Sequence, residues 1–137
     1  MNKLTVTIPS YNQTAFLERC LLYLEKQTFK DFSIIIADDC STEDYKKVIA
    51  KFPNLKIKYQ RNEKNLGAIQ NIFHTITMPV ESEYLLSLHE DDALAYPEYL
   101  EKSIEIMEKN KNIAFVTGKP YWFKDAVPEK MIEGKEL

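Results

Sequence analysis

The chain has little cysteine, no excess of positive charge and no long apolar run, and each absence removes a class of protein. Its net charge is −3, whereas a general nucleic-acid binder usually carries a basic patch or stripe, so we expect no nucleic-acid partner. No apolar stretch approaches the ~20 residues that a bilayer span requires. The first residues are no signal peptide, because a charged strand pattern starts at once. We therefore expect a cytoplasmic protein without a membrane span, with the cytoplasmic face of the membrane as a further location.

The two cysteines, Cys20 and Cys40, lie in a helical pattern and in a turn. Because they lack the close spacing of a metal motif, they predict free thiols and not a disulfide or a zinc pair. Hydrophobic residues make up 45% of the 137-residue chain and charged residues 28%. This composition fits a globular protein that buries one core.

Segments with strand periodicity alternate with segments of helical periodicity along the chain. The predicted strands cover residues 3–9, 32–38, 55–60, 83–89 and 113–118. Helical spacing is found over residues 12–29, over a short segment that Ser41 and Thr42 cap and Pro53 ends, over 65–78, and from Pro97 onward. Strands joined by helical crossovers predict an α/β protein with three α/β/α layers and a mainly parallel, Rossmann-like sheet.

Polar clusters follow three of the predicted strands, at Pro9–Asn12, Asp38–Ser41 and His89–Asp92. In parallel sheets ligands bind outside the carboxyl ends of the strands, so these clusters are expected to meet at one edge. Helix capping could explain any single acid among them, but it explains the set poorly.

The acids predict a nucleotide site with a divalent cation. Asp91 and Asp92 are adjacent and repel each other unless a cation compensates them, and Mg²⁺ or Mn²⁺ prefers a few carboxylates together with phosphate oxygens. A carboxylate at Asp38 or Asp39 could accept a hydrogen bond from a nucleobase N–H, and Tyr11 offers a ring for stacking. A phosphorelay receiver fits poorly, because it needs its acidic pair after the first strand.

Three segments carry a resemblance to a known family: "TVTIPSYNQTAFLERCLLYLEKQTFKDFSIIIADDCST", "NEKNLGAIQN" and "YLLSLHEDDALAYPEYL". From about Leu4 to Gly118 the chain resembles the amino-terminal half of family 2 glycosyltransferases. These enzymes have the GT-A fold and generally invert the anomeric centre. The resemblance implies transfer of a sugar from a UDP- or dTDP-sugar to an acceptor hydroxyl, on a glycan or lipid-linked acceptor, in polysaccharide or cell-surface glycan synthesis.

The resemblance also assigns roles to individual residues. Pro9 and Tyr11 match the segment along the base, and Asp39 or its neighbour Asp38 matches the acid that reads the base N–H. Asn65 and Gly67 match a loop near the diphosphate. Asp91 looks like the ribose-side acid and a second metal ligand. Asp92 looks like the principal ligand of Mn²⁺ or Mg²⁺, with His89 as a further candidate.

The chain departs from the common family form at two positions of interest. His89 stands where most relatives have aspartate, and Cys40 stands where they have glycine. A hydrogen-bonded structural histidine is the alternative for His89. Glu90 is expected to face away from the site or to cap the following helix.

The resemblance divides the chain into a donor-binding domain, residues 1–118, and the start of an acceptor-side region, residues 119–137. We expect the general base that deprotonates the acceptor beyond Leu137, so no catalytic residue is assigned. A second interpretation stays open: a catalytically inactive nucleotide-binding or interaction module of the same fold.

Overall fold

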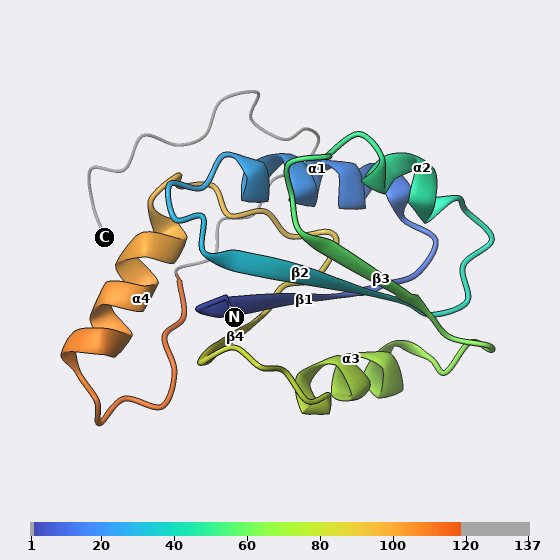
Figure 1. Cartoon of the computed structure of the whole chain (residues 1–137). Coiled ribbons are helices and arrows are strands. Elements are labelled where there is room, and N and C mark those ends of the chain that lie inside the picture. Colours follow the sequence, from blue (N-terminus) through green and yellow to red (C-terminus); the bar gives the residue numbers. More distant parts are fainter. Residues whose placement is uncertain (1, 119–137) are drawn as a thin grey trace.

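The computed structural model describes residues 2–118, and within them four parallel strands alternate with four helices (Figure 1). The predicted second domain, residues 119–137, lies outside the described residues. The elements are β1 (Leu4–Ser10), α1 (Thr14–Glu25), β2 (Phe32–Asp38), α2 (Tyr45–Ile49), β3 (Ile57–Arg61), α3 (Ala68–Thr77), β4 (Tyr84–Ser87) and α4 (Tyr99–Lys109).

The strands are arranged in the order β3-β2-β1-β4, and every pairing is parallel. Helices α1 and α2 cover one face of the sheet and α3 covers the other, which is the predicted three-layer arrangement (Figure 1). Strands β1 and β2 are central and pair over seven residues each, from Leu4 beside Phe32 to Ser10 beside Asp38. Their carboxyl ends therefore finish together.

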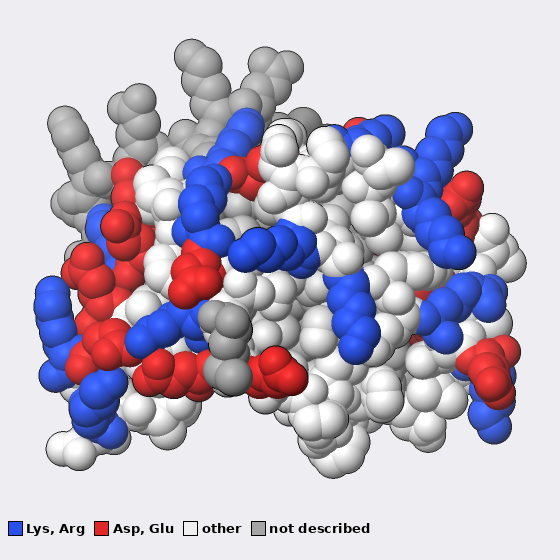
Figure 2. Space-filling model, viewed as in Figure 1, with Lys and Arg blue, Asp and Glu red and all other residues white. Residues whose placement is uncertain are grey.

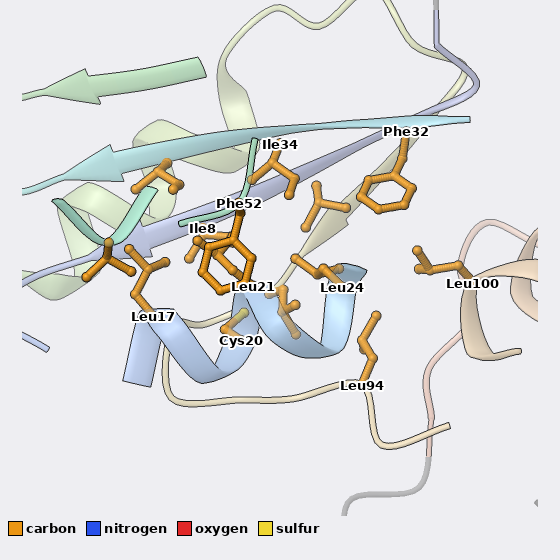
Figure 3. Close-up of a cluster of buried hydrophobic side chains, with 14 of the residues drawn as sticks. Ile8, Leu17, Cys20, Leu21, Leu24, Phe32, Ile34, Phe52, Leu94 and Leu100 are labelled. Carbon is orange, nitrogen blue, oxygen red and sulfur yellow. The ribbon is translucent and has the colours of Figure 1, made fainter. Parts of the chain in front are cut away.

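The core lies between α1 and the sheet (Figure 3). One stripe of α1, at Leu17, Cys20, Leu21 and Leu24, is fully buried, as its helical spacing predicts. It packs on the alternate residues of β1 and β2 that face it, which are Val6, Ile8, Ile34 and Ile36. Both cysteines are free thiols, as predicted.

Helix α1 ends at Glu25, four residues before the predicted end at residue 29. The reason is Gln27, whose fully buried side chain serves as a tether and not as a helix surface. Its Nε2 donates to the carbonyls of Leu94 and Tyr96 over 3.3 and 2.8 Å. Its Oε1 accepts from the Leu100 amide over 3.1 Å. The side chain thereby fixes the segment that joins β4 to α4.

The predicted strand at residues 113–118 is wrong, because these residues have no strand structure. A strand requires a hydrogen-bonded neighbour, and among the described residues β4 pairs only with β1. Phe115 is accordingly 76% exposed.

Helix α4 lies beside the amino ends of the strands, away from the predicted site (Figure 1). Glu108 of α4 binds Lys3 before β1 over 2.7 Å and accepts from the Tyr84 hydroxyl over 2.8 Å. Figure 2 shows acidic and basic side chains crowded around this end of the molecule. No helix in the described part of the chain combines the length and apolar character that crossing a membrane requires.

Candidate functional site

The three predicted polar clusters meet at the carboxyl edge of the sheet. The Asp39 amide donates to the Ser10 carbonyl over 2.8 Å, which joins the end of β1 to the segment that follows β2. The Leu88 amide donates to the Thr7 carbonyl over 3.0 Å, so the segment after β4 begins alongside β1. Parallel register therefore brings together residues that are far apart in sequence.

The loop after β1, residues 11–14, is held by side chains from distant segments; we call it the Tyr11 loop. Its four successive amides donate, in chain order, to Glu90 Oε1, Ser41 Oγ, the Tyr45 hydroxyl and Glu43 Oε2, over 2.7, 2.9, 3.1 and 2.9 Å. These amides begin α1, which has no side-chain cap of its own at Gln13. Unpaired amides at a helix start favour carboxylate partners. Tyr11 itself is 45% exposed, so its ring is open for stacking.

Glu90 points into the protein, and the prediction that it faces away or caps the next helix is wrong. It is only 6% exposed. Oε1 accepts from the Tyr11 amide, and Oε2 accepts from the Tyr45 hydroxyl over 2.7 Å. Burial raises the pKa of Glu90, while these two hydrogen bonds oppose the rise. Glu90 therefore ties the residues after β4 to those after β1.

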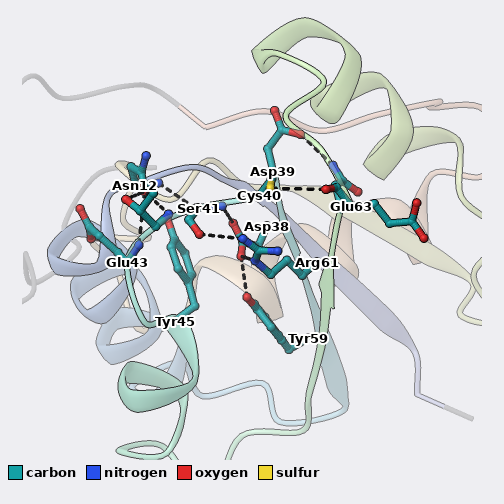
Figure 4. Close-up of polar contacts among 12 residues, drawn as sticks. Asn12, Asp38, Asp39, Cys40, Ser41, Glu43, Tyr45, Tyr59, Arg61 and Glu63 are labelled. Atoms are coloured by element: carbon teal, nitrogen blue, oxygen red, sulfur yellow. Dashed lines mark hydrogen bonds and ion pairs between the residues drawn. The ribbon is translucent and has the colours of Figure 1, made fainter.

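Asp38, at the end of β2, is completely buried and has three partners within the chain (Figure 4). Oδ1 accepts from the Ser41 amide over 2.9 Å, and Oδ2 accepts from the Tyr59 hydroxyl over 2.5 Å. Arg61 Nε lies 3.4 Å from Oδ2. Asp38 thus connects β2 to β3 and to the turn that precedes α2.

Asp39 organises the loop between β3 and α3. Its Oδ1 accepts from Asn62 Nδ2 and from the Leu66 amide, and its Oδ2 accepts from the Gly67 amide, each over 2.8 Å. Asn65 Oδ1 also accepts from the Gly67 amide, over 2.9 Å. The structure therefore brings the predicted residues Asp39, Asn65 and Gly67 into one cluster. Asp39 is 1% exposed.

The turns at this edge contain the positive φ angles of the described residues. Gly67 has φ 87°, which glycine adopts without a Cβ penalty. Asn12 and Cys40 have φ 52° and 65°. Asparagine tolerates this region better than most residues, whereas cysteine is strained in it. The glycine expected from the family at position 40 is therefore explained by backbone conformation.

The segment His89–Asp92, the acidic turn, presents its other three side chains outward. His89, Asp91 and Asp92 are all exposed, and the Asp92 amide closes the turn by donating to the His89 carbonyl over 3.0 Å. Partial desolvation, and then the neighbouring Asp91 carboxylate, raise the pKa of Asp92. A cation bound here would relieve that repulsion.

Arg19 of α1 supports the acidic turn from behind. Its Nη2 donates to the Asp91 carbonyl, and its guanidinium lies 4.8 Å from the centre of the Phe16 ring. Arg19 Nε is the one buried side-chain nitrogen or oxygen without a partner in the part of the chain described. The positive charge of Arg19 partly offsets the raised pKa of Asp92.

The donor set fits a hard divalent cation that the substrate helps to bind. Among residues 2–118 no three His, Cys, Asp or Glu side chains gather as a metal group. Asp91 and Asp92 offer carboxylate oxygens at an exposed turn. Mg²⁺ typically binds through one or two carboxylates and completes its shell with substrate phosphates and water. The structure is compatible with that mode, and the metal role of Asp92, Asp91 and His89 stays a prediction.

Comparison with known proteins decides the family. The family model described as "Glycosyl transferase family 2" matches residues 5–133. The chain belongs to glycosyltransferase family 2. The resemblance is thus confirmed over nearly the whole chain.

Two relatives and one solved structure illustrate the range of the family. An uncharacterized glycosyltransferase of Haemophilus influenzae is 34% identical over 113 residues, which cover 82% of this chain and 37% of the relative. A GalNAc(5)-diNAcBac-PP-undecaprenol beta-1,3-glucosyltransferase of Campylobacter jejuni is 29% identical over 139 residues, covering all of this chain and 44% of the relative. The chain therefore spans less than half the length of these relatives.

The solved structure is Staphylococcus aureus TarS, residues 1–349, in complex with UDP. It superposes with a TM-score of 0.70 at 28% identity, over 78% of this chain and 32% of TarS. TarS of Staphylococcus aureus is named a poly(ribitol-phosphate) beta-N-acetylglucosaminyltransferase. The likeness confirms the GT-A fold predicted from the sequence.

Sequence reasoning missed the residues that support the site from inside. Glu90 and Tyr45 are joined across 45 positions and Tyr59 and Asp38 across 21. Asn71 is buried in α3 and donates to the Ala37 carbonyl over 2.9 Å. Helical spacing gave no signal for Asn71, because it lies on the side of α3 opposite the apolar residues Ile69, Phe73 and Ile76, which are exposed in the structure.

Proposed function

We propose that this chain binds the donor of a glycosyl transfer, a UDP- or dTDP-sugar, across the carboxyl edge of its sheet. The observation that carries the proposal is the hydrogen bond from the Tyr11 amide to Glu90, which joins the turn that carries the exposed acids Asp91 and Asp92 to the loop that carries Tyr11. One end of this surface suits a base and the other suits a metal-bound diphosphate. The UDP complex of the related TarS supports a uridine nucleotide.

The base would lie along Pro9 and Tyr11. Asp39 accepts three hydrogen bonds from the chain, and a carboxylate has room for about four. One position is therefore left for the N3–H that uracil and thymine share. Asp38 is assigned to the framework instead, because β3 and the turn before α2 depend on it.

The sugar diphosphate would extend from the Asn65–Gly67 loop toward the acidic turn. Asp91 would bind the ribose side, and Asp92, with Asp91 and His89 as further ligands, would hold Mn²⁺ or Mg²⁺. When bound, the cation would supply neutralisation of the charge that develops on the leaving diphosphate. Asp91 and Asp92 orient the donor so that its anomeric carbon faces the acceptor.

In the transfer, the acceptor hydroxyl oxygen forms a bond to the anomeric carbon while the bond from that carbon to the diphosphate oxygen breaks. The hydroxyl proton goes to a general base, whose position beyond Leu137 stays a prediction. We propose a glycan or lipid-linked acceptor of cell-surface glycan synthesis, reached at the cytoplasmic face of the membrane.

Isothermal titration calorimetry tests the proposal directly. UDP should bind the 137-residue chain in Mn²⁺ or Mg²⁺ and should bind at least about tenfold more weakly in EDTA, as expected when phosphate oxygens complete the metal shell. Asp92→Ala should remove the difference between the two conditions. Asp31→Ala, which removes an exposed acid before β2, should retain it.

Absence of UDP binding with either ion would refute the donor site. Binding of UDP, without release of UDP from any sugar donor by the longest natural form of the protein, would favour the inactive-module alternative. Release of UDP that depends on an added acceptor would support transfer.

A further inference from the structure

Glu90 stands out from the rest of the acidic turn because it is the one acid there that is buried. Its neighbours His89, Asp91 and Asp92 are exposed, whereas Glu90 reaches 79 positions back in sequence to the Tyr11 amide. Its second oxygen is oriented by Tyr45, whose hydroxyl also accepts from the Gln13 amide. One carboxylate of the acidic turn thus binds the Tyr11 loop twice, directly at Tyr11 and indirectly through Tyr45.

We propose that Glu90 is a positioning residue that sets the distance between the base side and the metal side of the donor site. The inference rests on the proposed function. Glu90 touches neither base nor metal in this scheme; it acts through the Tyr11 loop on one side and through the backbone of Asp91 on the other.

The contacts leave the acidic turn little freedom to move relative to the Tyr11 loop. Glu90 is anchored at both oxygens, over 2.7 Å each, and Arg19 holds the Asp91 carbonyl from α1. The hydrogen bonds of Glu90 are largely shielded from water, since its exposed fraction is 6%. Charge-assisted bonds of this kind are short and well oriented.

A ligand that spans both sides depends on this spacing more than a ligand that occupies one side. When two linked groups bind two sites, the second binds with an effective concentration that falls if the sites do not match the linker. UDP with Mn²⁺ engages both the Tyr11 loop and the acidic turn. Uridine lacks the diphosphate and its metal, so it engages the Tyr11 loop and, through its ribose, only Asp91 of the acidic turn. Loss of Glu90 should therefore weaken UDP with Mn²⁺ more than uridine.

The test measures the dissociation constants of both ligands, for uridine by NMR titration and for UDP with Mn²⁺ by calorimetry. In the wild-type chain the ratio of the two constants gives the advantage of spanning both sides. Glu90→Ala should reduce this advantage about tenfold, the scale on which groups supporting metal ligands typically act. Tyr45→Phe, which leaves Glu90 Oε2 without its donor, should reduce it in the same direction by a smaller factor.

Glu43→Ala is the matched control. Glu43 accepts from the amide and hydroxyl of Thr14, so its loss loosens the same loop without touching the acidic turn. The ratio should then stay at the wild-type value even if both affinities fall. Glu90→Gln preserves the size of the side chain and an acceptor for the Tyr11 amide, and it replaces Glu90→Ala if that variant does not fold.

The outcomes separate this inference from the function on which it rests. Equal losses for uridine and for UDP with Mn²⁺ in the Glu90 variants would show that Glu90 only stabilises the fold, and would overturn the positioning role alone. Failure of the wild-type chain to bind UDP would overturn both. A reduced ratio in the Glu90 and Tyr45 variants, with the Glu43 control unchanged, supports the proposal.

Discussion

Two pairs of adjacent aspartates stand at the same edge of the sheet in opposite environments. Asp38 and Asp39, after β2, are 0% and 1% exposed and accept hydrogen bonds from the chain at every carboxylate oxygen. Asp91 and Asp92, after β4, are exposed. The comparison teaches that aspartates can mainly build a site, as Asp38 and most of the Asp39 carboxylate do, or mainly bind in it, as proposed for Asp91 and Asp92. Burial and available donors decide which.

The largest expected difference between the two pairs is in folding stability. Asp38→Ala would leave the Tyr59 hydroxyl, the Ser41 amide and Arg61 without their shared acceptor. Leaving a buried donor without its acceptor costs about 1 to 3 kcal/mol, and both the Ser41 amide and the Tyr59 hydroxyl lose theirs. We therefore expect the free energy of unfolding to fall by about 3 kcal/mol in urea denaturation. Asp91→Ala, in the exposed pair, should change it by no more than about 0.5 kcal/mol. Similar losses in the two variants would contradict the comparison.

A second difference between the two pairs is backbone strain, which is found at Cys40, the residue after the buried pair. Cys40 has φ 65°, a conformation that costs a residue with a Cβ about 1 to 2 kcal/mol. Cys40→Gly removes this cost but adds about 0.4 to 1 kcal/mol of unfolded-state entropy. The net result should be a stabilisation of roughly 0.5 to 1 kcal/mol in thermal or urea denaturation. Cys40→Ser retains the Cβ and should show no such gain; a gain there would mean that strain is not the cause.

The smallest expected effect concerns the exposed pair. Asp92 has a raised pKa in the folded chain, so its ionised form is less favourable there than in the unfolded chain. Asp92→Asn should therefore raise the free energy of unfolding at pH 7 by a few tenths of a kcal/mol, a size limited by solvent screening. The gain should shrink as the pH falls through the raised pKa of Asp92 toward its ordinary value of 3.8. Urea denaturation at several pH values measures it, and a gain that grows on acidification would have the wrong sign.

The fold was largely predictable because the relevant signals are local. The stripe of α1 and the apolar run of β2 each follow from the periodicity of a single segment. The end of α1 was not predictable, because Gln27 leaves the helix to bind residues 67 to 73 positions away. The absence of a strand at residues 113–118 was unpredictable for a similar reason. An apolar run forms a strand only when a neighbouring strand pairs with it, and that neighbour is distant in sequence.

The location of the site at the carboxyl ends of the strands was predictable for the same reason. The direction in which its side chains point was not. Strand ends locate Tyr11, Asp39 and Asp92 at one edge whatever their side chains do. Whether Glu90 points inward depends on donors at Tyr11 and Tyr45, which no spacing within the acidic turn reveals. Neighbouring acids in "HEDD" therefore have different surroundings although their local sequence is alike.

The buried amide of Gln27 has a consequence for the order in which the molecule assembles. Its bonds to Leu94, Tyr96 and Leu100 close loops of 67, 69 and 73 residues, and contacts of such separation carry a large entropic cost before they form. We expect β1, α1 and β2 to associate early, because they are consecutive in the chain, and the segment from the acidic turn to α4 to dock late. The part of the protein proposed to bind the metal would then be the last to reach its native arrangement.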